Sequence, residues 1–269
     1  MNFELDEELA MVRDMARDFA VQELDPRARK HDQQGFIDKE VFGHIADLGL
    51  WGLTIPESYG GAGMGNTELS LVLEEINRAD ASVGVTLSVH NSLLGTPIMK
   101  FGSEAKKEEW LPKLASGEAI GCYCLTEPNA GSDAAAVQTR AVRDGDDWII
   151  SGTKIWVTNG GLASLAIVYA RTDPDVSKAK GLSAFLVPLD APGVVLGSPE
   201  KKTGIRASST LEIQFDGVRV DGDSLIGAEG QGFQIAMDTL DGGRIGIASQ
   251  AVGIGRACLE ASIKYAGER

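Results

Sequence analysis

Cysteine and histidine are scarce in this sequence, which holds three of each among 269 residues. Cys122 and Cys124 share one face of an expected strand, and no second cysteine pair or histidine cluster follows. Metal sites need such clustered ligands, so we predict no metal site. The same scarcity excludes a disulfide-stapled secreted domain and favours small buried thiols in a reducing compartment.

The sequence also contains few basic residues and no long apolar run. Lys and Arg number 25 against 39 Asp and Glu, which gives a net charge of -14. Nucleic-acid surfaces need clustered basic residues, so this balance argues against a nucleic-acid partner. No apolar run reaches membrane-spanning length, and the acidic N-terminus lacks a signal or transit pattern. We therefore expect a cytoplasmic protein without membrane contact.

Residues 1–117 show the period of amphipathic helices and predict an all-α domain. Pro26 should end the first helix or begin the next segment. A later helix should cover residues 68–79 behind a cap at Asn66 or Thr67. The buried face of the first helix is expected to consist of Leu9, Val12, Ala16, Phe19 and Val21.

An apolar segment over residues 83–101 predicts a buried helix that is broken or bent at Pro97. His90 lies within it, and a lone histidine there is more often a hydrogen-bonded core residue than a catalyst. His31 and His44 stand in charged or helical surroundings and form no cluster with His90.

From residue 118 the pattern changes to that of short strands divided by Gly and Pro. Residues 118–228 therefore predict a β-barrel or sandwich domain. A hairpin over residues 141–150 should turn at Asp144-Gly145-Asp146. Further strands are expected at residues 165–171, 182–188, 194–196, 211–215 and 218–220.

The helical period returns in residues 229–269. Apolar residues three and four apart form a seam that needs partner helices, and we expect those helices to lie outside the chain. The predicted fold class is α+β: an N-terminal all-α domain, a middle β-barrel and the start of a C-terminal helical bundle. The seam consists of Ile247, Ala251, Ile254, Cys258, Ala261 and Tyr265.

Residues 123–133 form a short strand that runs into a loop of turn formers. Such a strand end offers fixed backbone N–H groups, the hydroxyls of Thr126 and Ser132, and close approach at Gly131. A flat polar heterocycle with phosphates needs such a surface. An ordinary strand-to-turn junction is the alternative.

A second strand end, residues 154–161, places Trp156 beside Thr158. Together, at this separation, the two stretches resemble the acyl-CoA dehydrogenase family, whose signatures read Tyr-Cys-x-Thr-Glu-Pro-x-x-Gly-Ser-Asp and Trp-Ile-Thr-Asn. The match looks closest to the short-chain (butyryl-type) branch, and residues 49–61 and 202–209 look like the family too.

The resemblance implies an FAD enzyme that oxidises the Cα–Cβ bond of a short-chain acyl-CoA to the trans-2-enoyl-CoA. A carboxylate takes the Cα proton while flavin N5 accepts a hydride from Cβ, across a dry slot. The resemblance also implies electron transfer to an electron-transferring flavoprotein, and a homo-oligomer that is a tetramer at full length.

Site residues follow from the same resemblance. The implied cofactor-binding residues are Tyr123, Cys124, Leu125, Thr126, Gly131, Ser132, Trp156, Val157, Thr158 and Arg269, the last reaching the flavin phosphates of a neighbouring subunit. The implied substrate-binding residues are Ser132, Asp241, Gly242, Gly243 and Arg244, the last facing the nucleotide end of coenzyme A. The two glycines stand either inside a helix or in a loop before a late helix start.

The catalytic base is the main departure from the family pattern. The usual glutamate, in a Tyr-Glu-Gly-Thr context, does not occur, and a minority of the family carry the base just before the arginine at 244, where this chain has Gly243. Glu127 is interpreted as structural. No catalytic residue is therefore assigned; the base is expected beyond Arg269, in a chain that looks C-terminally truncated. A non-catalytic flavin- or acyl-CoA-binding unit and an oxidase or monooxygenase on the same fold stay open.

Overall fold

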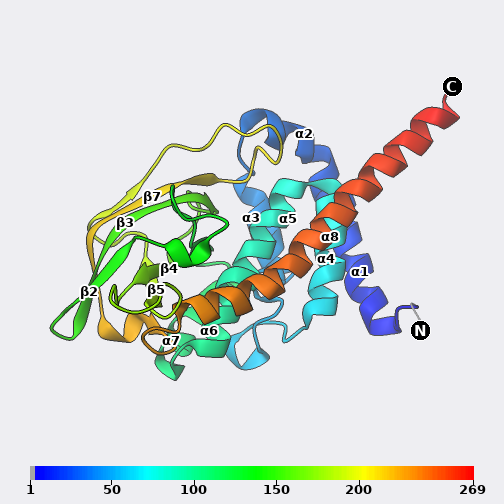
Figure 1. Cartoon of the computed structure of the whole chain (residues 1–269). Coiled ribbons are helices and arrows are strands. Elements are labelled where there is room, and N and C mark those ends of the chain that lie inside the picture. Colours follow the sequence, from blue (N-terminus) through cyan, green and yellow to red (C-terminus); the bar gives the residue numbers. More distant parts are fainter. Residues whose placement is uncertain (1–3) are drawn as a thin grey trace.

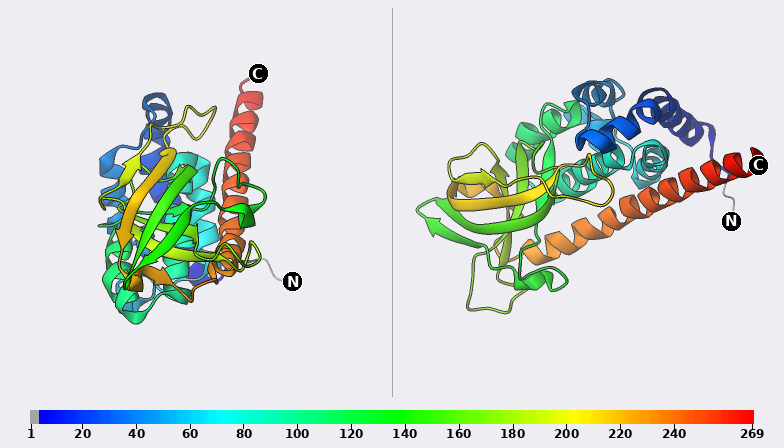
Figure 2. Two further views of the ribbon diagram at one scale, coloured as in Figure 1. Left: turned by 60° about the vertical axis from the view of Figure 1, so that its left-hand side comes forward. Right: turned by 90° about the horizontal axis from the view of Figure 1, so that it is seen from above.

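A computed structural model describes residues 4–269, so residues 1–3 of the expected N-terminal domain lie outside it. Helices fill one half of the molecule and a sheet the other, and the long helix α8 (Gly232–Gly267) crosses both. Its last turns project past the helical half, at the end of the molecule where α1 begins (Figure 1). Seen from above, α8 passes along one side of both halves (Figure 2).

Within residues 4–269, the helical half is built from seven α-helices joined by short 3₁₀ and π-helical segments. Among residues 4–269, no helix is long and apolar enough to cross a membrane. The α-helices are α1 (Glu7–Phe19), α2 (Asp25–Gln34), α3 (Lys39–Asp47), α4 (Asn66–Ala79), α5 (Ala81–Ser88), α6 (Thr96–Phe101) and α7 (Glu104–Ser116).

A π-helical turn, η1 (Ala20–Leu24), joins α1 to α2 and changes the predicted buried face. Val12, Ala16 and Phe19 are buried as predicted, but Val21 is 46% exposed, so that prediction is wrong. A π-turn takes an extra residue per turn and shifts the helical phase. Ala20 and Leu24 point inward instead.

The start of α4 also differs from the prediction. The helix begins at Asn66, so neither Asn66 nor Thr67 is its cap. Gly65 is the capping residue, and the Glu68 carboxylate accepts a hydrogen bond from the Gly65 N–H at 3.0 Å. Glycine has no side chain that could accept a hydrogen bond from the first helical turn. The capping contact therefore comes from the side chain of Glu68, the third residue of the helix.

The apolar segment is helical without a break: a π-helical segment, η4 (Val89–Gly95), joins α5 to α6, and Pro97 lies in the first turn of α6, so the predicted break at Pro97 does not occur. His90 is fully buried in η4. Its Nδ1 accepts from the Gly121 N–H at 3.2 Å, and its Nε2 donates to the Leu114 carbonyl at 3.1 Å. The prediction of a satisfied core histidine is confirmed. Burial lowers the pKa of His90 to about 4, despite its backbone hydrogen bonds.

Replacing His90 by Gln should flatten part of the pH dependence of stability. The unfolded chain takes up the proton near the ordinary pKa of 6.5, and the folded chain only near 4. The stability that neutral His90 contributes is therefore complete above pH 6.5 and is lost as pH falls towards 4. Between pH 7 and 4 the parent should lose about 3 kcal/mol more than His90→Gln in urea unfolding. Parallel losses in the two chains would contradict this.

In the described part of the chain, an eight-stranded sheet forms the other half, with β6-β7-β3-β2-β4-β5-β8 as its path and β1 paired to β4. The predicted strands at 165–171, 182–188 and 194–196 are confirmed, as is the hairpin. The two strands expected at 211–215 and 218–220 are wrong: they are one strand with Gly217 inside it at φ 63°. The strands are β1 (Gly121–Cys124), β2 (Arg140–Asp144), β3 (Asp147–Thr158), β4 (Leu165–Arg171), β5 (Leu182–Pro188), β6 (Val194–Leu196), β7 (Thr210–Val220) and β8 (Leu225–Ile226).

The sheet curls around its own apolar core. The Trp148 ring of β3 meets the Phe185 ring of β5 at 5.2 Å, although β2 and β4 lie between these strands in the sheet. Cys122 and Cys124 are buried in the same core, on one face of β1 as predicted. A second core, which includes Tyr169, joins the other face of β4 and β5 to α6 and α8.

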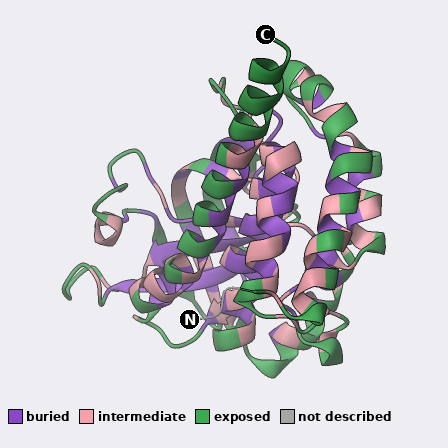
Figure 3. Ribbon diagram, turned by 90° about the vertical axis from the view of Figure 1, so that its right-hand side faces the viewer, coloured by how far each residue is buried: buried purple, intermediate pink, exposed green. Residues whose placement is uncertain are grey.

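The sequence left Gly242 and Gly243 either inside a helix or in a loop before it. In the structure both lie inside α8. Its buried face uses small residues: Gly243, Gly246 and Gly253 lie against η4, α5 and α4. The predicted seam is on another face and stays mostly exposed in residues 4–269, with Ile247 51% and Tyr265 57% exposed. The last turns of α8 are exposed on all sides that Figure 3 shows.

Candidate functional site

The end of β1 leaves its parallel partner and crosses to β3. Cys124 is the last residue of β1 that pairs with β4, opposite Val168. The Thr126 carbonyl then accepts a hydrogen bond from the Ile155 N–H of β3 at 2.9 Å. This bond joins the two predicted strand ends, residues 123–133 and 154–161, so Thr126 lies beside the end of β3.

A bulge in β3 turns its end outward. Lys154 pairs with Ile213 and Val157 with Leu211, so β3 has an extra residue against β7. Trp156 lies in this bulge at φ 58° and is 59% exposed. A bulky residue at positive φ is strained, and such residues cluster at functional sites. Val157 is buried, and Thr158 is half-buried at the end of the strand.

The loop in which the first stretch ends carries Gly131 and Ser132 on the surface. Arg171 donates to the carbonyls of Ala135 at 2.8 Å and Val137 at 3.1 Å, which fixes the far side of the loop. Asp133 forms an ion pair with Lys178.

Two tyrosine hydroxyls near the junction form no hydrogen bond of normal length among residues 4–269, although they lie close enough to affect each other's pKa. The rings of Tyr123 and Tyr169 meet at 5.1 Å, and both hydroxyls are buried. Burial raises the pKa of Tyr123, so its hydroxyl stays a donor. Unpaired buried donors are costly, and they are retained where a ligand or water completes them.

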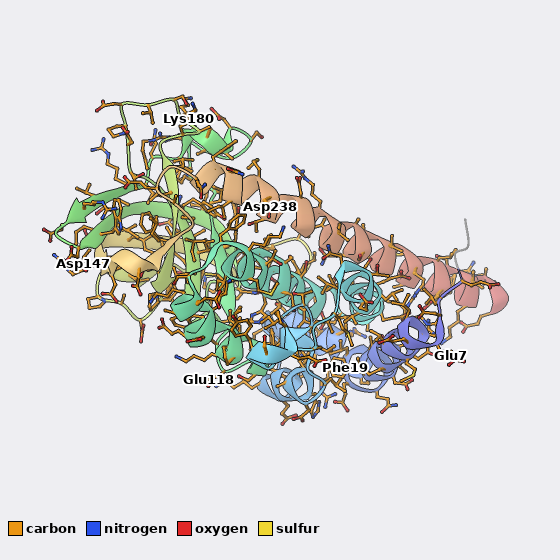
Figure 4. All side chains as sticks on the ribbon, turned by 90° about the horizontal axis from the view of Figure 1, so that it is seen from below. Glu7, Phe19, Glu118, Asp147, Lys180 and Asp238 are labelled. Atoms are coloured by element: carbon orange, nitrogen blue, oxygen red, sulfur yellow. The ribbon has the colours of Figure 1, made fainter. Side chains whose placement is uncertain are left out.

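The Asp241–Arg244 segment lies about three turns into α8, which begins at Gly232. Asp241 and Gly242 line a cavity of about 460 Å³ between α8, α6 and the 54–66 loop, and Ser132 does not line it. Asp241 and Arg244 form an exposed ion pair. Asp238 also lines this cavity. In Figure 4 its label lies between those of Asp147, at the hairpin, and Glu7, at the start of α1.

Arg269 is far from the other predicted site residues. It follows α8 and donates to the Tyr265 hydroxyl. Twenty-five residues separate it from Arg244, which is roughly 37 Å along a helix. Arg269 therefore does not join the site of its own chain.

A buried ion pair beneath the junction was predicted only in part. Glu127 is structural, as predicted: its carboxylate lies 2.7 Å from the Lys154 ammonium and accepts from the Thr139 N–H at 3.0 Å. Lys154 was not recognised as buried. The alternation along the strand could have indicated its burial. Trp148, Ile150 and Lys154 face the same side of β3, and all three are buried.

The arrangement can hold a flat aromatic ligand with polar edges. Thr126 and Thr158 supply hydroxyls, Trp156 supplies an exposed aromatic face, and Tyr123 supplies an unused donor. No group of three or more His, Cys, Asp or Glu side chains that could hold a metal occurs within the described chain.

Three family models match this chain. The acyl-CoA dehydrogenase N-terminal domain matches residues 6–118, the middle domain residues 122–218 and the C-terminal domain residues 230–269.

Relatives cover the chain almost completely. The mitochondrial short-chain specific acyl-CoA dehydrogenase of Bos taurus is 48% identical over 99% of this chain and 64% of its own length. A probable acyl-CoA dehydrogenase of Bacillus subtilis is 45% identical over 100% and 71%. The chain thus spans about two thirds of the length of these relatives.

Solved structures are similar to this chain over almost its whole length. Butyryl-CoA dehydrogenase from Megasphaera elsdenii has a TM-score of 0.96 at 41% identity, over 100% of this chain and 71% of its own. A chain of a structure described as the electron transferring flavoprotein of Acidaminococcus fermentans has a TM-score of 0.97 at 42% identity, over 100% and 70%. Glutaryl-CoA dehydrogenase from Mycobacterium smegmatis, in complex with FADH2, has a TM-score of 0.91 at 37% identity, over 98% and 67%. By sequence and by structure, this chain belongs to the acyl-CoA dehydrogenase family.

Proposed function

We propose that the chain forms the flavin- and thioester-binding part of an acyl-CoA dehydrogenase. The reaction is the FAD-dependent α,β-dehydrogenation of a short-chain acyl-CoA to the trans-2-enoyl-CoA, with electrons passed to an electron-transferring flavoprotein. The observation that carries the proposal is the β1–β3 junction, which brings Thr126, Trp156 and Thr158 together. The names of the relatives and of the similar structures support the substrate class, the cofactor and the electron acceptor.

The residues at the junction fit FAD. Thr126 and Thr158 would hydrogen-bond the polar edge of the ring system, and Trp156 would lie beside the ring. The Tyr123 hydroxyl is a buried donor without a hydrogen bond of normal length in the described residues, as expected where a ligand or water supplies the acceptor. When bound, FAD supplies the electron acceptor of the reaction.

The substrate would span the loop and α8. Ser132 is exposed on the 127–139 loop and would donate to the thioester end of the substrate. Arg244 is exposed on α8 and would meet the phosphates at the nucleotide end of coenzyme A. No neighbouring atom lies within 4 Å of the position that a Cβ on Gly242 would take, so a ligand can approach the backbone there.

A non-catalytic flavin- and acyl-CoA-binding unit is the second candidate, favoured by one observation. The carboxylates of the site segments are all engaged: Asp133 with Lys178, Asp241 with Arg244, and Glu127 in its buried ion pair. The lowered pKa of Glu127 makes that carboxylate a poor proton acceptor.

The oligomeric state and the cellular compartment are part of the proposal. The exposed seam of α8 supports a homo-oligomer with further helices against it, a tetramer in the complete protein. Arg269, remote from its own site, would serve a neighbouring subunit's flavin. We retain the cytoplasm as the compartment, although the Bos taurus relative is named as mitochondrial.

FAD binding tests the proposed function. Equilibrium dialysis should show FAD retained by the parent chain and about tenfold weaker retention in Thr126→Val and Thr158→Val, because each loses one hydrogen bond from a site that excludes water. Thr153→Val, half-buried earlier in the same strand, is the matched control and should bind like the parent. A parent chain that does not retain FAD would refute the proposal.

A further inference from the structure

Lys154 is fully buried in β3, at the place where β1 and β4 separate. Its ammonium donates to the Leu125 carbonyl at 3.1 Å, to the Tyr169 carbonyl at 2.7 Å and to Glu127 Oε1 at 2.7 Å. An ammonium has three donors, and all three are used.

These partners explain why β1 ends where it does. After Cys124 and Val168, the next pair in the parallel ladder would be Leu125 and Tyr169. The carbonyls of both residues instead accept from Lys154, whose ammonium stands between the two strands. The chain after β1 therefore turns to β3, where the Thr126 carbonyl meets the Ile155 N–H.

Glu127 closes the loop that follows. Besides Lys154, its carboxylate accepts from the N–H groups of Gln138 at 2.6 Å and Thr139 at 3.0 Å, and from the Thr139 hydroxyl at 2.5 Å. Both ends of the loop that carries Ser132 are thereby fixed to one buried carboxylate.

A buried ion pair is weak evidence for stability. Removing two charges from water costs several kcal/mol per ion, and apolar replacements are often neutral or stabilising. Burial lowers the pKa of Lys154, although Glu127 opposes this. Burial acts to raise the pKa of Glu127, but Lys154 and the hydrogen bonds outweigh it and the net shift is downward. Stability alone does not account for a pair that joins four segments of backbone.

We propose that Lys154 and Glu127 are positioning residues that hold the end of β1 away from β4 and against the β3 bulge. They thereby set the separation of Thr126 from Trp156 and Thr158, and the base of the loop that carries Ser132. The effect on flavin binding rests on the proposed function; the effect on the backbone does not.

The test compares the parent with Lys154→Met/Glu127→Gln, which removes both charges at nearly constant shape. Lys106→Met, a mostly buried lysine paired with Glu109 on α7, is the matched control. Hydrogen exchange at the Ile155 amide should be about tenfold faster in the double variant, relative to a β4–β5 amide, because its acceptor on Thr126 is no longer held. FAD affinity should fall about tenfold, and the band shape of bound flavin should change. The control should alter none of these three quantities.

An Ile155 amide that exchanges as slowly in the double variant as in the parent would overturn the proposal. If the double variant does not fold, Glu127→Gln alone, which keeps the shape and the lysine, is measured in the same way with the same criterion. A parent that fails to bind FAD would refute the proposed function, and the amide exchange would still decide whether Lys154 and Glu127 position the backbone.

Discussion

Gly253→Ala should destabilise the chain by about 3 kcal/mol, although alanine is the better helix former. A Cβ at Gly253 would lie 2.5 Å from the Glu74 carbonyl oxygen and 3.0 Å from the Arg78 nitrogen. Both are backbone atoms of α4, so no side-chain rotation can relieve the contact. Helix α8 would have to move away from α4.

Gly255→Ala is the matched control, two residues further along the same helix. No atom lies within 4 Å of a Cβ there, so alanine should stabilise the chain by up to about 1 kcal/mol. Urea unfolding of both variants gives the comparison directly. A Gly253→Ala chain as stable as Gly255→Ala would show that the close approach of α4 and α8 does not occur.

The packing of α8 on α4 matters for the site because α8 carries Asp241–Arg244. The Gln250 amide donates to Asn77 Oδ1 at 2.9 Å, deep between the two helices. Further along, Arg256 pairs with Glu74 and the buried Glu75. These contacts fix the rotation of α8, and with it the side that Arg244 presents.

Strands β4 and β5 could be predicted closely from the sequence because each is a short apolar run bounded by turn residues. The failures have local causes that a periodicity cannot show. A π-turn moved Val21 to the surface, and Gly217 bent a strand without ending it. Both depend on how the segment packs against its neighbours.

The site could be predicted as two strand ends, but not as one surface. That Thr126 and Trp156 lie together depends on the β3 bulge, whose extra residue appears only in the register against β7. The burial of Lys154 could have been predicted from its phase in the strand. Its role at the fork between β1 and β4 required the pairing of three strands.

We predict that this chain lacks its own catalytic base. Glu127 is held by Lys154 and by donors from Gln138 and Thr139, and its lowered pKa opposes proton uptake. At Gly243, where a minority of the family carry the base, a Cβ would meet the Leu93 side chain at 2.7 Å. Asp241 and Asp133 are paired on the surface. Without a base the Cα proton stays in place, so the rate of flavin reduction should fall by several orders of magnitude.

The most direct measurement is an anaerobic titration of the FAD-loaded chain with butyryl-CoA, followed by the visible absorbance of the flavin. Dithionite, which needs no base, is the control and should bleach the flavin. We expect butyryl-CoA to perturb the flavin spectrum, because the thioester binds beside the ring, but to leave the flavin oxidised. Bleaching by butyryl-CoA would contradict this, since a group within these 269 residues would then be removing the proton.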